Sequence, residues 1–257
     1  MSTDNNLVKI KQLRASTGAG FKDCGLALSE CNGDIEKSIE YLRIKGISKA
    51  SKKMERLAKE GLVCVSHNEK NSSIIEINCE TDFVAKNQEY QKFCNEISDL
   101  NLQEKGNIDK LAKTKMSDDI IVEENLVKLI AKIGEKISIG RTKYLNHNNA
   151  KSFVYIHNSV NENAGKLGVI SLIKSNNNNN EKFKEFGRKL SMHIAASNPL
   201  SIDENSLNKD LIEKEKNIVH EELKSSGKPE NIIEKISKGR LTKFIQENTL
   251  LNQYWVM

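Results

Sequence analysis

An acid and an aromatic residue stand side by side directly after a strongly apolar run. The run "IIEINC" at residues 74–79 predicts a half-buried strand, and Asp82 and Phe83 follow it where helical spacing begins. A carboxylate and a ring at such a turn can project together as a wedge into a partner. The same residue types also allow Thr81 or Asp82 to cap the helix and Phe83 to pack inward. Residue types alone leave both interpretations open.

The histidines do not indicate a metal site. His193 lies in "SMHIAAS" on a mostly buried helix, where we expect a hydrogen-bonded core histidine. His157 stands at a strand end and is more open, whereas His67 and His147 fall in polar loops and are expected to be solvated. We therefore expect no metal ligands, no catalytic residues and no cofactor.

The cysteines are odd in number and widely spaced, at positions 24, 31, 64, 79 and 94. This spacing contains no CxxC pair and suggests neither a disulfide framework nor a zinc site. We interpret them as buried thiols in a reducing compartment. Cys79 directly precedes the candidate wedge, and a redox-sensing thiol is the alternative there.

Composition and charge exclude several classes of protein. The chain has 257 residues, a net charge of +5, 37% hydrophobic and 29% charged residues, and only two prolines, which favours long helices. Its charges are interspersed, so no specific nucleic-acid partner is expected. No apolar run approaches the roughly 18–20 residues that span a bilayer, and the N-terminus lacks a signal-peptide core. We expect a cytoplasmic protein without membrane contact.

The first fifty residues predict a small three-helix unit. Leu7 to Leu13 have helical spacing, the glycines at 18 and 20 end that helix, and Phe21 to Leu28 form a second. The segment 18–20 lacks GxxxxGK[ST] spacing and does not follow a strand, so it is no phosphate loop. Asp34 caps a third helix that is expected to bury Ile35, Ile39, Tyr41 and Leu42.

Two hairpin-then-helix arrangements follow a charged helical connector at residues 48–60. Strands at 62–65 and 74–79 form the first hairpin, and strands at 153–156 and 167–173 form the second. We interpret this order as a weak internal duplication of an α+β layer. Further elements are expected as a helix at 123–133, a strand around 137–144, a polar surface excursion at 101–119, an asparagine loop at 176–180 and a helix at 181–196.

Residues 204–247 predict an antiparallel helical hairpin. Apolar residues recur on a narrow stripe, and "SSGKP" at 225–229 ends one helix and begins the next. The expected stripe consists of Leu207, Leu211, Ile218 and Leu223 on the first arm and Ile232, Ile236, Leu241, Phe244 and Ile245 on the second. One interpretation is a coiled coil that dimerises the protein. Because the two arms bury most of the apolar stripe against each other, a contact with another protein at the tip or flank is favoured.

Several motifs together resemble one known family. In order along the chain they are "LRASTGAGFKDC", "NGDIEKSIEYLR", "INCETDFVAKN", "AKIGEKISI", "MHIAASNP" and "SSGKPENIIEKISKGRLTKF". The chain resembles elongation factor Ts, the nucleotide-exchange factor of elongation factor Tu, from about Leu7 to Met257. The resemblance implies a translation factor that binds GDP-bound and nucleotide-free elongation factor Tu and promotes GDP release, so that GTP can bind.

The resemblance also implies contact residues. Thr81, Asp82, Phe83 and Val84 would enter the GTPase beside its magnesium and disturb metal coordination. Phe83 would wedge between partner side chains, with His157 nearby on the same partner.

Further implied contacts lie elsewhere in the chain. Ile133 of "AKIG" matches one contact position, while Arg14, Phe21 and Lys22 would lie against the partner's nucleotide domain. The implied fold is α+β. It comprises a three-helix ubiquitin-associated-like domain at 1–54, a two-part core of antiparallel hairpins packed with helices at 55–145 and 146–257, and a protruding helical hairpin at about 204–247.

Some positions depart from the family pattern. Phe21 and Lys22 stand where many members carry a methionine pair, so a charge enters a packed contact. Gly25 replaces a common lysine and weakens its helix by up to about 1 kcal/mol. Bacterial members often continue beyond "QYWVM" into another partner-binding helix. We expect either a shortened sequence or a chain without those contacts and with lower affinity.

Two other hypotheses compete with nucleotide exchange. A non-catalytic adaptor would bind a GTPase without accelerating GDP release, and a thiol or metal enzyme would depend on Cys79 or on bound zinc.

Overall fold

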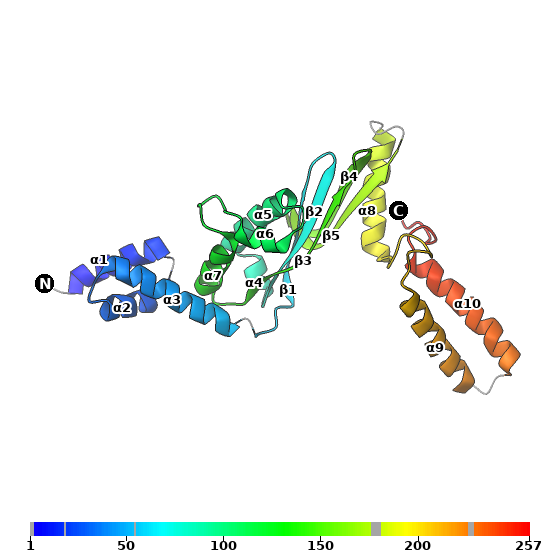
Figure 1. The fold of residues 1–257 in the computed structure, drawn as a ribbon, viewed down its shortest axis with the longest axis horizontal. Coiled ribbons are helices and arrows are strands. Elements are labelled where there is room, and N and C mark those ends of the chain that lie inside the picture. The colour runs from blue at the N-terminus through cyan, green and yellow to red at the C-terminus, as the bar shows by residue number, and fades with distance from the viewer. Residues whose placement is uncertain (1–2, 18, 54, 176–180, 226–228) are drawn as a thin grey trace. The chain divides into compact units, whose positions relative to one another are not determined.

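The computed structural model describes residues 3–17, 19–53, 55–175, 181–225 and 229–257 (Figure 1). The chain divides into two compact units, Met1–Asn176 and Asn177–Met257. The asparagine loop at 176–180, the turn residues 226–228 and Gly18 lie outside the described residues. The domain boundaries after residues 54 and 145 stay predictions. The α+β class is confirmed.

Three helices form the N-terminal part: α1 (Thr3–Thr17), α2 (Phe21–Glu30) and α3 (Ile35–Lys53). The Asp34 carboxylate accepts the backbone N–H of Lys37 at 3.0 Å, so the predicted cap is confirmed. Ile39 is exposed, however, and Ser38 is buried in its place, with its hydroxyl 3.2 Å from the Ala27 carbonyl. Successive residues of an α-helix are rotated by about 100° around its axis. Ser38 therefore faces the core, and Ile39 points away from it.

The predicted connector helix at 48–60 was wrong as a separate element. Helix α3 continues without interruption to Lys53, and residues 55–59 then lead irregularly into the first strand. The charged residues up to Lys53 therefore belong to the third helix and do not form a separate connector helix.

Within the described residues the strands form one five-stranded sheet in the order β3-β2-β1-β5-β4, and every pairing is antiparallel. The strands are β1 (Glu60–His67), β2 (Asn71–Cys79), β3 (Ile137–Asn146), β4 (Ala150–Asn161) and β5 (Ala164–Lys174). Both predicted hairpins are confirmed. They join through β1 and β5, which pair at Val63 with Gly165 and at Cys64 with Ala164.

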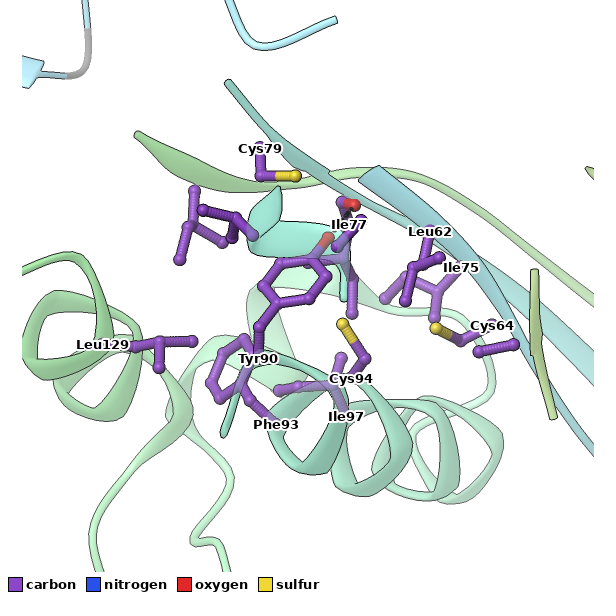
Figure 2. Close-up of a cluster of buried hydrophobic side chains, with 14 of the residues drawn as sticks. Leu62, Cys64, Ile75, Ile77, Cys79, Tyr90, Phe93, Cys94, Ile97 and Leu129 are labelled. Carbon is purple, nitrogen blue, oxygen red and sulfur yellow. Dashed lines mark hydrogen bonds between the residues drawn. The ribbon is translucent and has the colours of Figure 1, made fainter. Parts of the chain in front are cut away.

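Three helices pack on this sheet: α4 (Asp82–Ala85), α5 (Gln88–Gln103) and α7 (Val122–Ile133). A further short helix, α6 (Ile108–Lys113), packs on α5 and α7. Tyr90 reaches from α5 toward β2, and its hydroxyl donates to the Ile77 carbonyl at 2.5 Å (Figure 2). The predicted polar excursion at 101–119 was wrong in part. It contains α6, and Leu111 and Met116 are buried in the core.

The cysteines are free thiols, as expected. Cys64, Cys79 and Cys94 are buried in the same core as Tyr90 (Figure 2), and Cys24 is buried among the N-terminal helices. Cys31 is only half-buried. The four buried thiols therefore behave as small apolar core residues.

The second unit contains α8 (Glu181–Ser197), α9 (Lys209–Ser225) and α10 (Glu230–Asn248). The predicted helical hairpin is confirmed, and Leu207, Leu223 and Ile236 of its apolar stripe are buried or partly buried as predicted. Some other positions of the stripe were wrong by one residue or lie exposed. Val219, Leu223 and Ile233 are buried, whereas Leu211, Ile218 and Ile232 are exposed. Adjacent isoleucine and valine residues fit the period equally well, so the pattern does not decide which of them faces the partner helix.

His193 is buried on α8 and hydrogen-bonded, as predicted. Its Nε2 lies 3.1 Å from Gln253 Oε1, and its ring stacks on Trp255 with the centroids 5.1 Å apart. Phe186 on the same helix is exposed and also stacks on Trp255, with the ring centroids 6.0 Å apart. No helix among the described residues is long and apolar enough to cross a membrane.

Candidate partner-binding site

The segment 81–84 forms the turn between β2 and α5. Its short helix α4 buries Val84 and Ala85 against β1 and β2. Phe83, between Asp82 and these anchors, is 79% exposed. The interpretation in which Phe83 packs inward was therefore wrong, because two neighbouring residues take the buried face of this single turn.

The capping interpretation was also wrong. Thr81 occupies the N-cap position of α4, but within the described structure its side chain makes no capping hydrogen bond. Asp82 lies inside α4, and Asn87 caps the longer helix α5 by accepting the N–H groups of Glu89 and Tyr90 at 2.9 and 3.2 Å. The extra turn of α4 moves the start of the long helix beyond Asp82.

The Asp82 carboxylate is held as an anion on the surface. Its Oδ2 accepts a hydrogen bond from Lys86 Nζ at 2.8 Å, one helical turn further along. This hydrogen bond lowers the pKa of Asp82, with a smaller contribution from the charge of Lys166, and the same contact raises the pKa of Lys86. A negative charge therefore accompanies the exposed Phe83 ring at neutral pH.

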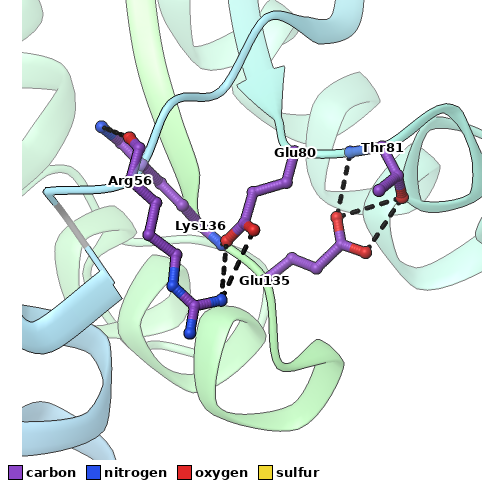
Figure 3. A network of polar contacts seen from close by, with 5 residues as sticks. All are labelled: Arg56, Glu80, Thr81, Glu135 and Lys136. Atoms are coloured by element: carbon purple, nitrogen blue, oxygen red, sulfur yellow. Dashed lines mark hydrogen bonds and ion pairs between the residues drawn. The ribbon is translucent and has the colours of Figure 1, made fainter.

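Two carboxylates, one from the turn before α4 and one from the turn after α7, hold these two turns together (Figure 3). Glu135, just after α7, accepts the Thr81 N–H at 3.0 Å and the Thr81 hydroxyl at 2.9 Å. Glu80 accepts the Lys136 N–H at 2.5 Å and pairs with Arg56 Nη1 at 3.4 Å. The base of the exposed turn is thus fixed from two sides.

His157 is exposed on β4, where its Nδ1 lies 2.9 Å from the Tyr155 hydroxyl. It pairs with Leu167 of β5, the neighbour of Lys166. Strand β5 also pairs with β1, against which α4 packs, so the sheet connects the strand of His157 with the exposed turn. The joined sheet therefore relates two sequence segments more than seventy residues apart.

Ile133 is the last residue of α7 and packs partly buried against the main core. Gly134 follows in the left-handed conformation, with φ of 89°, and turns the chain so that Glu135 faces Thr81. Ile133 thus lies two residues from the carboxylate that holds the exposed turn.

Arg14, Phe21 and Lys22 form a separate exposed group near the end of α1 and the start of α2. These helices pack mainly on each other and on α3. The predicted site residues therefore fall into two groups, one on the three-helix part and one around α4, α7 and β4.

Sequence reasoning missed Lys86, Glu80 and Glu135. The i,i+4 spacing of Asp82 and Lys86 is a visible signal for an ion pair. Thr81 and Glu135 are 54 residues apart in the sequence, and no local sequence pattern predicts their contact.

The described residues contain no group of three histidine, cysteine or acidic residues that could hold a metal ion. Burial raises the pKa of the Cys79 thiol to about 11, so this thiol is a poor nucleophile near neutral pH. The site consists of an exposed ring and carboxylate on a firmly held turn. Such an arrangement is typical of a protein that binds a partner by shape and charge.

Comparison with known proteins identifies the family. The sequence model described as Elongation factor TS matches residues 80–257. The proteins named Elongation factor Ts from Parvibaculum lavamentivorans and Bartonella henselae are 41% and 42% identical to the chain, over 96% and 97% of its length and 80% and 81% of theirs. The protein of that name from Rickettsia felis is 39% identical, over 95% of this chain and 79% of its own length.

The chain belongs to the elongation factor Ts family, the nucleotide-exchange factors of elongation factor Tu in translation elongation. Its members bind elongation factor Tu and neither make nor break covalent bonds in doing so.

Proposed function

We propose that the turn carrying Asp82 and Phe83 is the part of this chain that opens the nucleotide site of elongation factor Tu. The main observation that supports this proposal is that Phe83 is 79% exposed, whereas Val84 and Ala85 beside it are buried. An aromatic ring on an anchored turn can displace side chains of the partner while its own position stays fixed. Single exposed apolar residues are common on protein surfaces, so the support comes from the ring together with its fixed base.

The proposed target is the magnesium ion that bridges the nucleotide phosphates of the GTPase. Mg²⁺ requires near-octahedral geometry at short distances, so a small displacement of its surroundings weakens its binding strongly. Asp82 brings a negative charge to the same place, and Lys86 fixes the direction of that carboxylate. Thr81 and Val84 serve as the base of the wedge, one hydrogen-bonded and the other buried.

Thermodynamic linkage sets the requirement for such a factor. If the chain binds the empty GTPase more tightly than the GDP-bound form, GDP binding weakens by the same factor. In our proposal His157 and Ile133 add contacts beside the wedge. Arg14, Phe21 and Lys22, which are exposed on the three-helix part, bind the nucleotide domain.

Membership of the elongation factor Ts family favours exchange over an adaptor that binds the GTPase without exchanging its nucleotide. The deciding experiment measures release of fluorescent GDP from elongation factor Tu at substoichiometric amounts of the chain. Exchange predicts many turnovers per molecule and a slower rate for Asp82→Ala and Phe83→Ala at unchanged folding. Binding in a pull-down without faster GDP release supports the adaptor and contradicts our proposal.

A further inference from the structure

Two glutamates cross between the turn before α4 and the turn after α7. Each carboxylate accepts a backbone N–H of the other turn: Glu135 from Thr81 at 3.0 Å and Glu80 from Lys136 at 2.5 Å. The strands β2 and β3 pair as far as Cys79 and Ile137. The crossed pair continues this ladder beyond its last residues with side chains in place of backbone carbonyls (Figure 3).

This arrangement, which we call the glutamate clasp, also holds neighbouring segments. The Thr81 hydroxyl lies 2.9 Å from Glu135 Oε1, and Lys136 Nζ donates to the Arg56 carbonyl at 2.8 Å. Hydrogen bonds to carboxylates are about twice as strong as those between neutral groups. The clasp therefore ties the residues before β1, the base of the wedge and the end of α7 into one polar network.

The wedge depends on this external support because α4 cannot hold its own geometry. A helix of four residues is far shorter than the roughly 12–15 residues that make an isolated helix even marginally stable in water. Burial of Val84 and Ala85 fixes one end of the turn. The other end, at Thr81, is fixed by Glu135.

We propose that Glu135 is a positioning residue for Phe83, holding the ring at the angle at which it enters the partner. This inference rests on the proposed function of Phe83. Glu135 follows Gly134, whose left-handed conformation directs the chain toward Thr81. The clasp also fixes Ile133 relative to the wedge, so two proposed contact residues approach the partner as one rigid surface.

The test is a double-mutant cycle of Glu135→Ala and Phe83→Ala, with kcat/KM for GDP release from elongation factor Tu as the readout. We expect Glu135→Ala to lower kcat/KM about tenfold, equivalent to about 1.4 kcal/mol. In the Phe83→Ala background, Glu135→Ala should lower kcat/KM by less than about twofold, because no ring remains for Glu135 to position. Glu135→Gln should restore most of the rate, since its amide oxygen can still accept the Thr81 N–H.

Glu96→Ala is the matched control, because the Glu96 carboxylate likewise accepts a backbone N–H, from Ser117, at an exposed place between α5 and the loop before α7. It should reduce stability without changing exchange. Equal losses for Glu135→Ala in both Phe83 backgrounds, or an equal loss of exchange in Glu96→Ala, would overturn the positioning role.

A second measurement separates failure of the clasp from failure of the wedge. Hydrogen exchange of the Thr81 amide should accelerate at least about tenfold in Glu135→Ala and stay unchanged in Glu96→Ala. An unchanged Thr81 amide contradicts the clasp even if Phe83→Ala slows GDP release. A Phe83→Ala variant with the wild-type rate contradicts the proposed function and the positioning role with it, whatever the amide shows.

Discussion

Replacing Phe83 by alanine should damage nucleotide exchange while leaving the fold intact. Full burial of a phenylalanine side chain stabilises by about 1.5–3 kcal/mol. In the free chain 79% of Phe83 is exposed, so about 1.2–2.4 kcal/mol of that burial remains available in the partner complex. If this contribution is used in opening the nucleotide site, its loss lowers kcat/KM by about 8- to 60-fold.

Stopped-flow release of fluorescent GDP from elongation factor Tu measures this effect directly. The free energy of unfolding, measured in urea, should change by less than about 0.5 kcal/mol, as for most exposed positions. Tyr254→Ala is a suitable control, because Tyr254 is an aromatic residue with 82% exposure in the second unit, and its exchange rate should change less than about twofold. A Phe83→Ala variant that exchanges like the control refutes the reasoning.

Three further predictions concern other parts of the molecule. Gly25→Ala should stabilise the N-terminal helices by about 0.5–1 kcal/mol in thermal unfolding, since its added Cβ would meet Ile10 Cδ1 at an ordinary 3.6 Å; an unchanged or lower Tm contradicts this. The free energy of unfolding should fall as pH rises from about 9 toward 11, because burial raises the pKa of Cys79 to about 11 and the unfolded thiol ionises first. Cys79→Ala should flatten that fall, and an equally steep fall would show that other groups cause it. Tyr155→Phe should lower kcat/KM for GDP release about threefold, because the hydroxyl 2.9 Å from His157 Nδ1 is removed, and a wild-type rate would exclude a role for this pair.

The sequence predicted those elements whose signals are local. Both hairpins, the three N-terminal helices and the helical hairpin follow from period-two and helical spacing between clear turn residues. The same signals misplaced Ile218, because the adjacent Val219 fits the periodic stripe equally well. They misplaced Ile39 because the buried position beside it is taken by a polar residue, Ser38, whose hydroxyl hydrogen-bonds to the Ala27 carbonyl. In both cases tertiary packing decides which of the two adjacent residues is buried.

The candidate site shows the same division between local and distant contacts. Asp82 and Phe83 were identified from their position after a strand and from the motif that contains them. Their anchors were not, because the contact of Thr81 with Glu135 depends on the pairing of β2 with β3 and on the left-handed Gly134. The capping role given to Asp82 failed for a related reason, since a single extra helical turn separates it from α5.

The central claim is that the exposed turn releases GDP by disturbing the magnesium site. The most direct test compares the acceleration of GDP release by this chain with Mg²⁺ present and after its removal by EDTA. We expect the factor by which the chain accelerates GDP release to be at least about tenfold smaller without Mg²⁺, because the ion that the turn displaces is already absent. Equal fold acceleration in both conditions would contradict it.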